Sequence, residues 1–204
     1  MSFLLAKIGV PLDLQQYLAE YLSEDNGSLY FNYGDTDEVF SERCHQIPST
    51  SRLWVAGTSW KEITKTVIVS YSAIECIASL TLNRHRLGRL EDVSLVATGL
   101  KPSFSHAQTI NSFFPDSQIV MAFGKDLFGS LADITIATGI LRIPVIFAME
   151  QSGAIIINCR SQRYSMPCHK VSLSNFQRTV KSRLNTRTLK AKTADSFTKL
   201  LIEV

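Results

Sequence analysis

The chain has 204 residues, of which 45% are hydrophobic and 19% are charged, and its formal net charge is +3. This length supports one domain, or one domain with an extension, and it can bury a core without disulfides or a structural metal. The apolar fraction excludes a disordered chain, and the few glycines and prolines exclude a fibrous one. No apolar run approaches the roughly 18 residues of a membrane span, and the start MSFLLAKIGVPLD lacks the basic and apolar regions of a signal peptide. We therefore expect a cytoplasmic protein with no membrane partner.

The cysteine and glycine patterns argue against several cofactors. No CxxC pair occurs, and the adjacent Cys-His pairs at 44–45 and 168–169 are far apart in the sequence, so we expect reduced structural cysteines and no zinc site. The chain has no Walker P-loop, no GxGxxG and no GxSxG. The sequence thus predicts neither a nucleotide cofactor nor a nucleophile elbow.

The first 60 residues read as a lead-in segment that packs on the core. The apolar stripe of residues 11–23 has the spacing of one helix face, and Pro11 suits a helix start. A short strand is predicted at 29–33, and residues 34–52 read as polar and irregular.

Residues 61–143 change to an alternation of strands and helices. The β-branched and apolar runs at 66–71, 93–98 and 118–123 predict strands, and the intervening periodicity predicts three helices. The expected helices cover 72–82, a segment that starts at Ser105, and 130–141, with a basic loop at 83–92. Continuous apolar strands between helices favour an α/β fold with a mostly parallel sheet that is covered on both faces.

Residues 144–204 read as a C-terminal extension. Two apolar runs, 145–149 and 154–159, predict a hairpin across the turn EQSG. A short strand at 171–173, a helix at 174–184, a basic linker at 185–193 and a last helix at 195–202 complete the expected elements.

The charge of the chain is unevenly distributed. Residues 151–194 contain nine Lys or Arg and no Asp or Glu, whereas the first 150 residues carry a net charge of −5. Such asymmetry is typical of a polyanion partner, DNA or RNA above all; a solvated basic surface that balances the acidic front is the alternative. The predicted nucleic-acid-binding residues are Arg160, Arg163, Lys170, Arg178, Lys181, Arg183 and Arg187.

Three segments carry a resemblance to a known family. VSYSAIECIASL, SLVATGLKPS and QIVMAFGKDLFGSLADITI resemble the TOPRIM domain of primases and topoisomerases, and most of all the primase-like TOPRIM proteins of bacterial mobile elements. The resemblance implies a TOPRIM-like, Rossmann-like fold. In that family a glutamate ends the first strand as general acid or base, and paired aspartates after the third strand hold Mg²⁺.

This chain departs from the family at two of the three carboxylate positions. Tyr71 stands where the resemblance implies the glutamate, and Gly124 stands at the first aspartate, so only Asp126 remains. Glu75 lies one helical turn beyond Tyr71. Because Mg²⁺ is usually held by at least one or two carboxylates together with substrate phosphates, we expect a catalytically silent site without a bound metal; if the site is active, Glu75 and Asp126 are the candidate catalytic and metal-binding residues.

Other interpretations of these residues stay open. Asp126 can serve as a helix cap, and Glu75 can be the one solvent-facing residue of its helix. Trp54 and Trp60 can stack bases or simply pack. For the whole protein, three hypotheses remain: a silent TOPRIM-like protein that binds nucleic acid or assists a replication or mobilisation complex, a magnesium-dependent primase or nuclease, and a protein-interaction module that uses the hairpin at 145–159.

Overall fold

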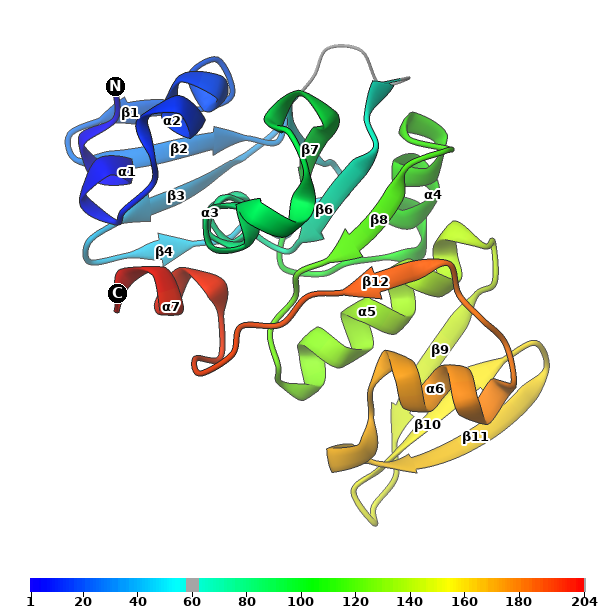
Figure 1. Cartoon of the computed structure of the whole chain (residues 1–204). Helices are drawn as coiled ribbons and strands as arrows, with labels where there is room; N and C mark the ends of the chain where they lie inside the picture. The colour runs from blue at the N-terminus through cyan, green and yellow to red at the C-terminus, as the bar shows by residue number, and fades with distance from the viewer. Residues whose placement is uncertain (58–62, 204) are drawn as a thin grey trace.

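A mostly parallel sheet forms the central layer of the molecule. The computed structural model describes residues 1–57 and 63–203. Among these, the central sheet has the strand order β12-β8-β6-β7-β5 (Figure 1). Its strands are β5 (Trp54–Gly57), β6 (Thr66–Ser70), β7 (Val93–Ala97), β8 (Gln118–Met121) and β12 (Thr186–Thr188). Neighbouring strands run parallel except β5, which is antiparallel to β7. The predicted α/β fold with a mostly parallel sheet is confirmed.

Helices cover both faces of this sheet because its central strands are apolar on both sides. Within β6, Ile68 packs into one core cluster, while Val67 and Val69 pack into the other. The helix α3 (Ala73–Leu87) belongs to the first cluster. The helices α4 (Phe104–Phe113) and α5 (Leu127–Ile140) belong to the second. Continuous burial on both faces is the pattern of a parallel sheet.

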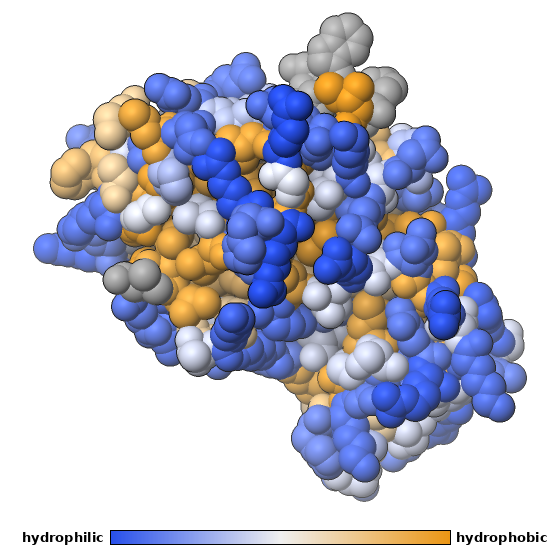
Figure 2. Space-filling model, in the orientation of Figure 1, coloured by the Kyte–Doolittle hydropathy of each residue, from blue (hydrophilic) through white to orange (hydrophobic). Residues whose placement is uncertain are grey.

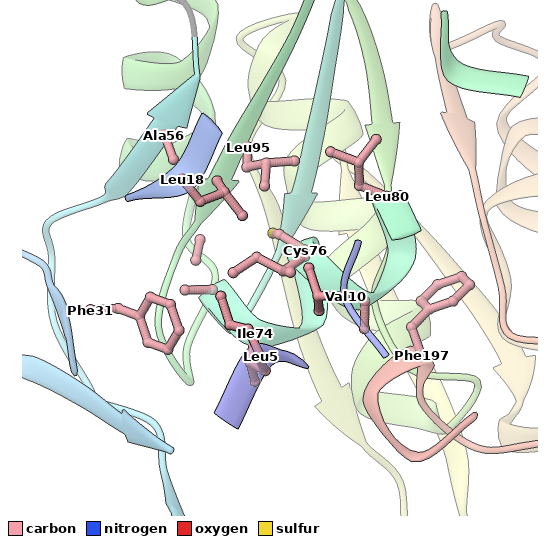
Figure 3. Packing of buried hydrophobic residues seen from close by; sticks show 14 of the residues in the cluster. Leu5, Val10, Leu18, Phe31, Ala56, Ile74, Cys76, Leu80, Leu95 and Phe197 are labelled. Carbon is pink, nitrogen blue, oxygen red and sulfur yellow. The ribbon is translucent and has the colours of Figure 1, made fainter. Parts of the chain in front are cut away.

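The N-terminal segment adds a small antiparallel sheet to the α3 face. Its elements are α1 (Phe3–Lys7), α2 (Leu12–Leu18), β1 (Ser23–Asp25), β2 (Ser28–Asn32), β3 (Asp37–Ser41) and β4 (His45–Gln46). Figure 3 shows Leu5, Leu18 and Phe31 of this segment gathered around Ile74 and Cys76 of α3. The N-terminal segment and the central sheet therefore share one hydrophobic core.

The chain after α5 builds a lobe and then returns to the centre. We call residues 145–184 the C-terminal lobe. It holds β9 (Val145–Met149), β10 (Ala154–Cys159), β11 (Gln162–Pro167), the 3-10 turn η3 (Cys168–Lys170) and α6 (Leu173–Val180). The visible face of this lobe, at the lower right of Figure 2, is largely hydrophilic. The chain then adds β12 to the central sheet and ends in α7 (Phe197–Ile202), which packs on α3 (Figure 1).

Several sequence predictions were wrong in the N-terminal half. Residues 34–52 are not irregular throughout, since they contain β3 and β4. The buried Glu38 in β3 interrupts the apolar alternation that would have revealed the strand. The helix predicted at 11–23 covers only α2, and α3 extends to Leu87, through the first half of the predicted loop at 83–92.

Other predictions were wrong near the C-terminus. No strand forms at 171–173; instead β11 lies at 162–167 and pairs with β10. The linker predicted at 185–193 contains β12, a strand of polar residues that pairs with β8. Both missed strands lie at sheet edges, where the apolar signal is weak. The hairpin of β9 and β10 is confirmed.

The central sheet takes strands from all three predicted segments. β5 comes from the first 60 residues and β12 from the last 61, while β6, β7 and β8 come from the middle. The division at residues 60 and 143 stays a prediction. Within residues 1–57 and 63–203, no helix is both long and apolar enough to cross a membrane.

Candidate functional site

The carboxyl ends of β6, β7 and β8 meet at one edge of the sheet, which is where ligands bind in open α/β folds. Tyr71, Thr98 and the turn at 122–124 follow these strand ends. We call this edge the strand-end site. The structure places Tyr71, Gly124 and Asp126 together there, because a Cβ atom on Gly124 would lie 3.4 Å from Asp126 Oδ1 and 3.7 Å from the Tyr71 hydroxyl oxygen.

Glu75 is turned away from solvent and caps the last helix. Its side chain is buried, so the prediction that it is the solvent-facing residue of its helix was wrong. One carboxylate oxygen accepts from the amide of Phe197, and the other accepts from the amide and the hydroxyl of Thr198 at 3.0 and 2.6 Å. Burial raises the pKa of Glu75, while the bonds from Thr198 and Phe197 lower it. Both oxygens are thus occupied in holding the first turn of α7.

Asp126 caps α5. Its Oδ1 accepts from the amide of Gly129 at 2.7 Å, and its backbone is extended, as in an N-cap residue. The cap requires glycine at position 129, because a Cβ there would lie 2.1 Å from the carbonyl oxygen of Gly124. Asp126 is itself exposed. The capping interpretation of this residue is therefore confirmed.

The carboxylates of Glu75 and Asp126 both act on Tyr71. Burial raises the pKa of its hydroxyl, and the negative charges of Glu75 and Asp126 raise it further. Its ring stands 6.0 Å from that of Phe123, measured between centroids. Tyr71 therefore presents a neutral, partly buried phenol at the strand end.

A lysine ammonium is built into the same edge. Lys190 Nζ donates to the carbonyl oxygens of Phe123 and Gly124 at 3.1 and 2.9 Å, and it pairs with Asp133 Oδ2 at 2.7 Å. Asp133 is buried on α5, and burial raises its pKa to about 6 although Lys190 lowers it. Sequence reasoning missed this pair because its members are 57 positions apart.

The segment before α7 also contacts the turn after β8. Lys125 donates from its amide to the carbonyl oxygen of Asp195 at 3.3 Å and from Nζ to that of Lys192 at 2.6 Å. Together with the cap at Glu75, these bonds anchor residues 189–198 across the strand-end site. Among the described residues, no three His, Cys, Asp or Glu side chains gather in a way that could hold a metal ion.

A second buried carboxylate, Glu38, was missed by the sequence prediction. It reaches from β3 to the start of α3, where it accepts from the amides of Ala73 and Ile74 at 2.7 and 3.4 Å and from Ser72 Oγ at 2.6 Å. His45 Nε2 contacts the same carboxylate at 2.9 Å and Ser72 Oγ at 3.3 Å. Ser72 and Glu38 both contact Nε2 of His45. In a nucleophilic triad the acid contacts the other ring nitrogen, so this arrangement does not match a triad. The cluster instead caps α3 and joins the two sheets.

All seven predicted nucleic-acid-binding residues are exposed. Arg163 pairs with Glu150 at 2.8 Å, and Arg187 donates to Gln118 at 3.4 Å. The other five side chains have no hydrogen bond or ion pair with any residue in 1–57 or 63–203. These unpaired residues are Arg160, Lys170, Arg178, Lys181 and Arg183.

The structure describes one of the two tryptophans. Trp54 is buried against Phe31, with ring centroids 5.6 Å apart, and its indole nitrogen donates to the carbonyl oxygen of Tyr21 at 2.9 Å. Trp54 is therefore a packing residue. Trp60 lies outside the described residues.

Comparisons with known proteins give a partial likeness in structure. No family profile and no curated protein matches the chain. The chain is similar to the primase fragment of the bacteriophage T7 primase-helicase protein, with 17% identity over 65% of this chain and 59% of that chain, at a TM-score of 0.44. It is also similar to a chain in a structure of bacteriophage T7 lagging-strand DNA polymerase interacting with primase domains bound to an RNA/DNA hybrid and dTTP, with 16% identity over 66% of this chain and 72% of that chain, at a TM-score of 0.44. The likeness concerns part of the fold and assigns no activity.

Proposed function

We propose that this protein is a catalytically silent TOPRIM-like protein that binds nucleic acid and serves a DNA replication or mobilisation complex. The observation that carries the proposal is the set of five exposed cations of the C-terminal lobe, Arg160, Lys170, Arg178, Lys181 and Arg183, that have no carboxylate partner among the described residues. Unpaired cations are available to a phosphate backbone, and residues 151–194 contain no carboxylate that would repel it.

The bonding of the strand-end carboxylates supports catalytic silence. Phosphoryl-transfer enzymes hold a divalent ion with carboxylate oxygens and use it to neutralise developing charge. Here both oxygens of Glu75 accept bonds from α7, and one oxygen of Asp126 accepts a bond from Gly129. Tyr71 and Gly124 add no further carboxylate. If Mg²⁺ binds at all, Asp126 is the residue with a free oxygen to hold it, and the ion would supply charge neutralisation there.

Salt dependence tests the binding proposal. A labelled single-stranded oligonucleotide is titrated with the protein in fluorescence anisotropy between about 50 and 200 mM salt. Each phosphate contact to a single strand contributes a slope of about −0.7 in log K against log salt, so five contacts give a slope of about −3.5. Affinity that is independent of salt would overturn the proposal.

Matched charge variants sharpen this test. We expect Lys170→Gln and Arg178→Gln each to make the salt slope shallower, by up to about 0.7. Arg163→Gln is the control, because Glu150 already neutralises that guanidinium. An equal effect of all three changes would show that net charge alone, and not the unpaired cations, sets the affinity.

A protein-interaction role is a second candidate, favoured by the edge strand β9. Ile146 and Met149 in this strand are 67% and 65% exposed, and an uncovered edge of a sheet can pair with another strand. In a dimer, β9 of a second copy of this chain would pair with this edge. Analytical ultracentrifugation distinguishes the roles: a dimer that Ile146→Lys dissociates supports the interaction role, and a monomer at all concentrations refutes it.

A further inference from the structure

A hollow lies in the C-terminal lobe, away from the strand-end site. It has a volume of about 220 Å³ and lies between the turn that joins β10 to β11 and the end of α6. We call it the lobe hollow. The hairpin contributes Arg160, Gln162 and Tyr164 to its wall, and Val180, Ser182 and Leu184 follow from α6. Because Phe176 beneath it is fully buried, the floor of the hollow is apolar.

One of the five unpaired cations, Arg160, lines this hollow. The other four, Lys170, Arg178, Lys181 and Arg183, are not part of its wall. No aspartate or glutamate lines the hollow, and none occurs in residues 151–194. The hollow therefore combines an apolar floor with one guanidinium group and no carboxylate.

The backbone at both sides of the hollow is held in an uncommon conformation. Arg160, Ser161 and Lys181 have φ values of 50°, 62° and 51°, in the left-handed region that non-glycine residues avoid. They are three of the five non-glycine residues with positive φ in the part of the chain that the structure describes. Arg160 and Ser161 form the two-residue turn between β10 and β11, and such a turn takes positive φ at both positions. Lys181 is the left-handed C-cap of α6.

We propose that the lobe hollow binds one nucleotide of a single-stranded nucleic acid. A guanidinium group forms two parallel hydrogen bonds to a phosphate, so Arg160 takes the phosphate at the rim. The half-buried ring of Tyr164 gives the base an aromatic face, and stacking on such a face accepts any base. Single-strand binders join a basic track to stacking side chains in this way. This inference rests on the proposed function and specifies its site.

Paired variants of equal charge test the phosphate contact. The probe is a labelled oligothymidylate, measured by fluorescence anisotropy at one low salt concentration. Arg160→Gln loses one charge at the hollow, and Arg178→Gln loses one charge outside it. We expect the first to weaken binding at least about tenfold more than the second, since charge-assisted hydrogen bonds to a bound phosphate are stronger than a screened, long-range attraction. Equal losses in both would overturn the hollow as the site and would leave nucleic-acid binding intact.

A change at Tyr164 tests the base contact separately. We expect Tyr164→Leu to weaken oligothymidylate binding about five- to one-hundredfold, the range of one base–aromatic stack, and to leave heparin, an anion without bases, bound as before. Tyr164→Phe keeps the ring and restores wild-type affinity, which separates stacking from a folding defect. Unchanged oligothymidylate binding by Tyr164→Leu, or an equal loss toward heparin, would refute the nucleotide site. If the wild-type protein binds no oligonucleotide at any salt concentration, the proposed function fails with it.

Discussion

The buried pair of Asp133 and Lys190 makes the stability of the protein depend on pH in a direction opposite to that of most ion pairs. The carboxyl of Asp133 is 3% exposed, and burial raises its pKa from 3.8 to about 6 in spite of the ammonium at 2.7 Å. Its Oδ1 has no hydrogen-bond partner among the described residues. A buried oxygen without a donor explains why desolvation outweighs the ion pair.

The magnitude follows from linkage between protonation and folding. The folded state binds a proton at Asp133 up to a pH of about 6, whereas the unfolded chain releases it near 3.8. Between these values the folded state holds more protons, so the stabilising contribution is present below pH 3.8 and is lost as pH rises through 6. Each pKa unit corresponds to 1.36 kcal/mol, so the loss amounts to about 3 kcal/mol by pH 7.

Urea unfolding of the wild type and of Asp133→Asn from pH 4 to pH 7 measures this loss. We expect the free energy of unfolding of the wild type to fall relative to the variant by about 2 kcal/mol across that range, because part of the full loss already occurs below pH 4. Asp116→Asn, at an exposed position before β8, is the matched control for the chemical change. A constant difference between wild type and Asp133→Asn would refute the reasoning, because it would mean that Lys190 fully compensates for burial.

Three further changes test the strand-end site. Glu75→Ala removes the acceptor of the first amides of α7, and we expect a loss of about 2 kcal/mol in the free energy of unfolding, with faster hydrogen exchange of the Phe197 amide; an unchanged urea midpoint would contradict the cap. Gly129→Ala places a Cβ 2.1 Å from the Gly124 carbonyl oxygen, so we expect a lower melting temperature and a cost of about 1–3 kcal/mol; a wild-type melting temperature would show that the turn relaxes freely. Gly124→Asp puts a second carboxylate beside Asp126 at a position where a Cβ meets only ordinary contacts; we expect Mg²⁺ to raise the melting temperature of this variant and not of the wild type, and equal shifts in both would refute the role of carboxylate number.

The central strands could be predicted from the sequence because their apolar runs are local signals. TVIVS, VSLVA and QIVM are buried at nearly every position, and each was assigned to a strand. β12 could not be found in the same way. Its residues are Thr, Arg and Thr, and it is a strand only because β8 offers unpaired backbone groups beside it.

The place of Asp126 between a strand and a helix was predictable, but the bonding of the buried carboxylates was not. The motif around Asp126 correctly indicated a strand end followed by a helix. The partners of Glu75 lie more than 120 positions later in the chain, and the helix amides that Glu38 caps lie more than 30 positions later. A single carboxylate in a polar segment gives no sign of burial, since solvated and helix-capping acids have the same local sequence.

The charged side chains at the strand-end site bond to the backbone of this chain. Helix starts leave amide groups without partners, and here the carboxylates of Glu38, Glu75 and Asp126 accept from the first turns of α3, α7 and α5. The carbonyl oxygens at the end of β8 need a donor in turn, and the ammonium of Lys190 provides it. Each charged group at this edge thus has a partner within the chain. The C-terminal lobe is the opposite case, because five of its six cations have no such partner among the described residues, and this contrast is why we place ligand binding in the lobe rather than at the strand ends.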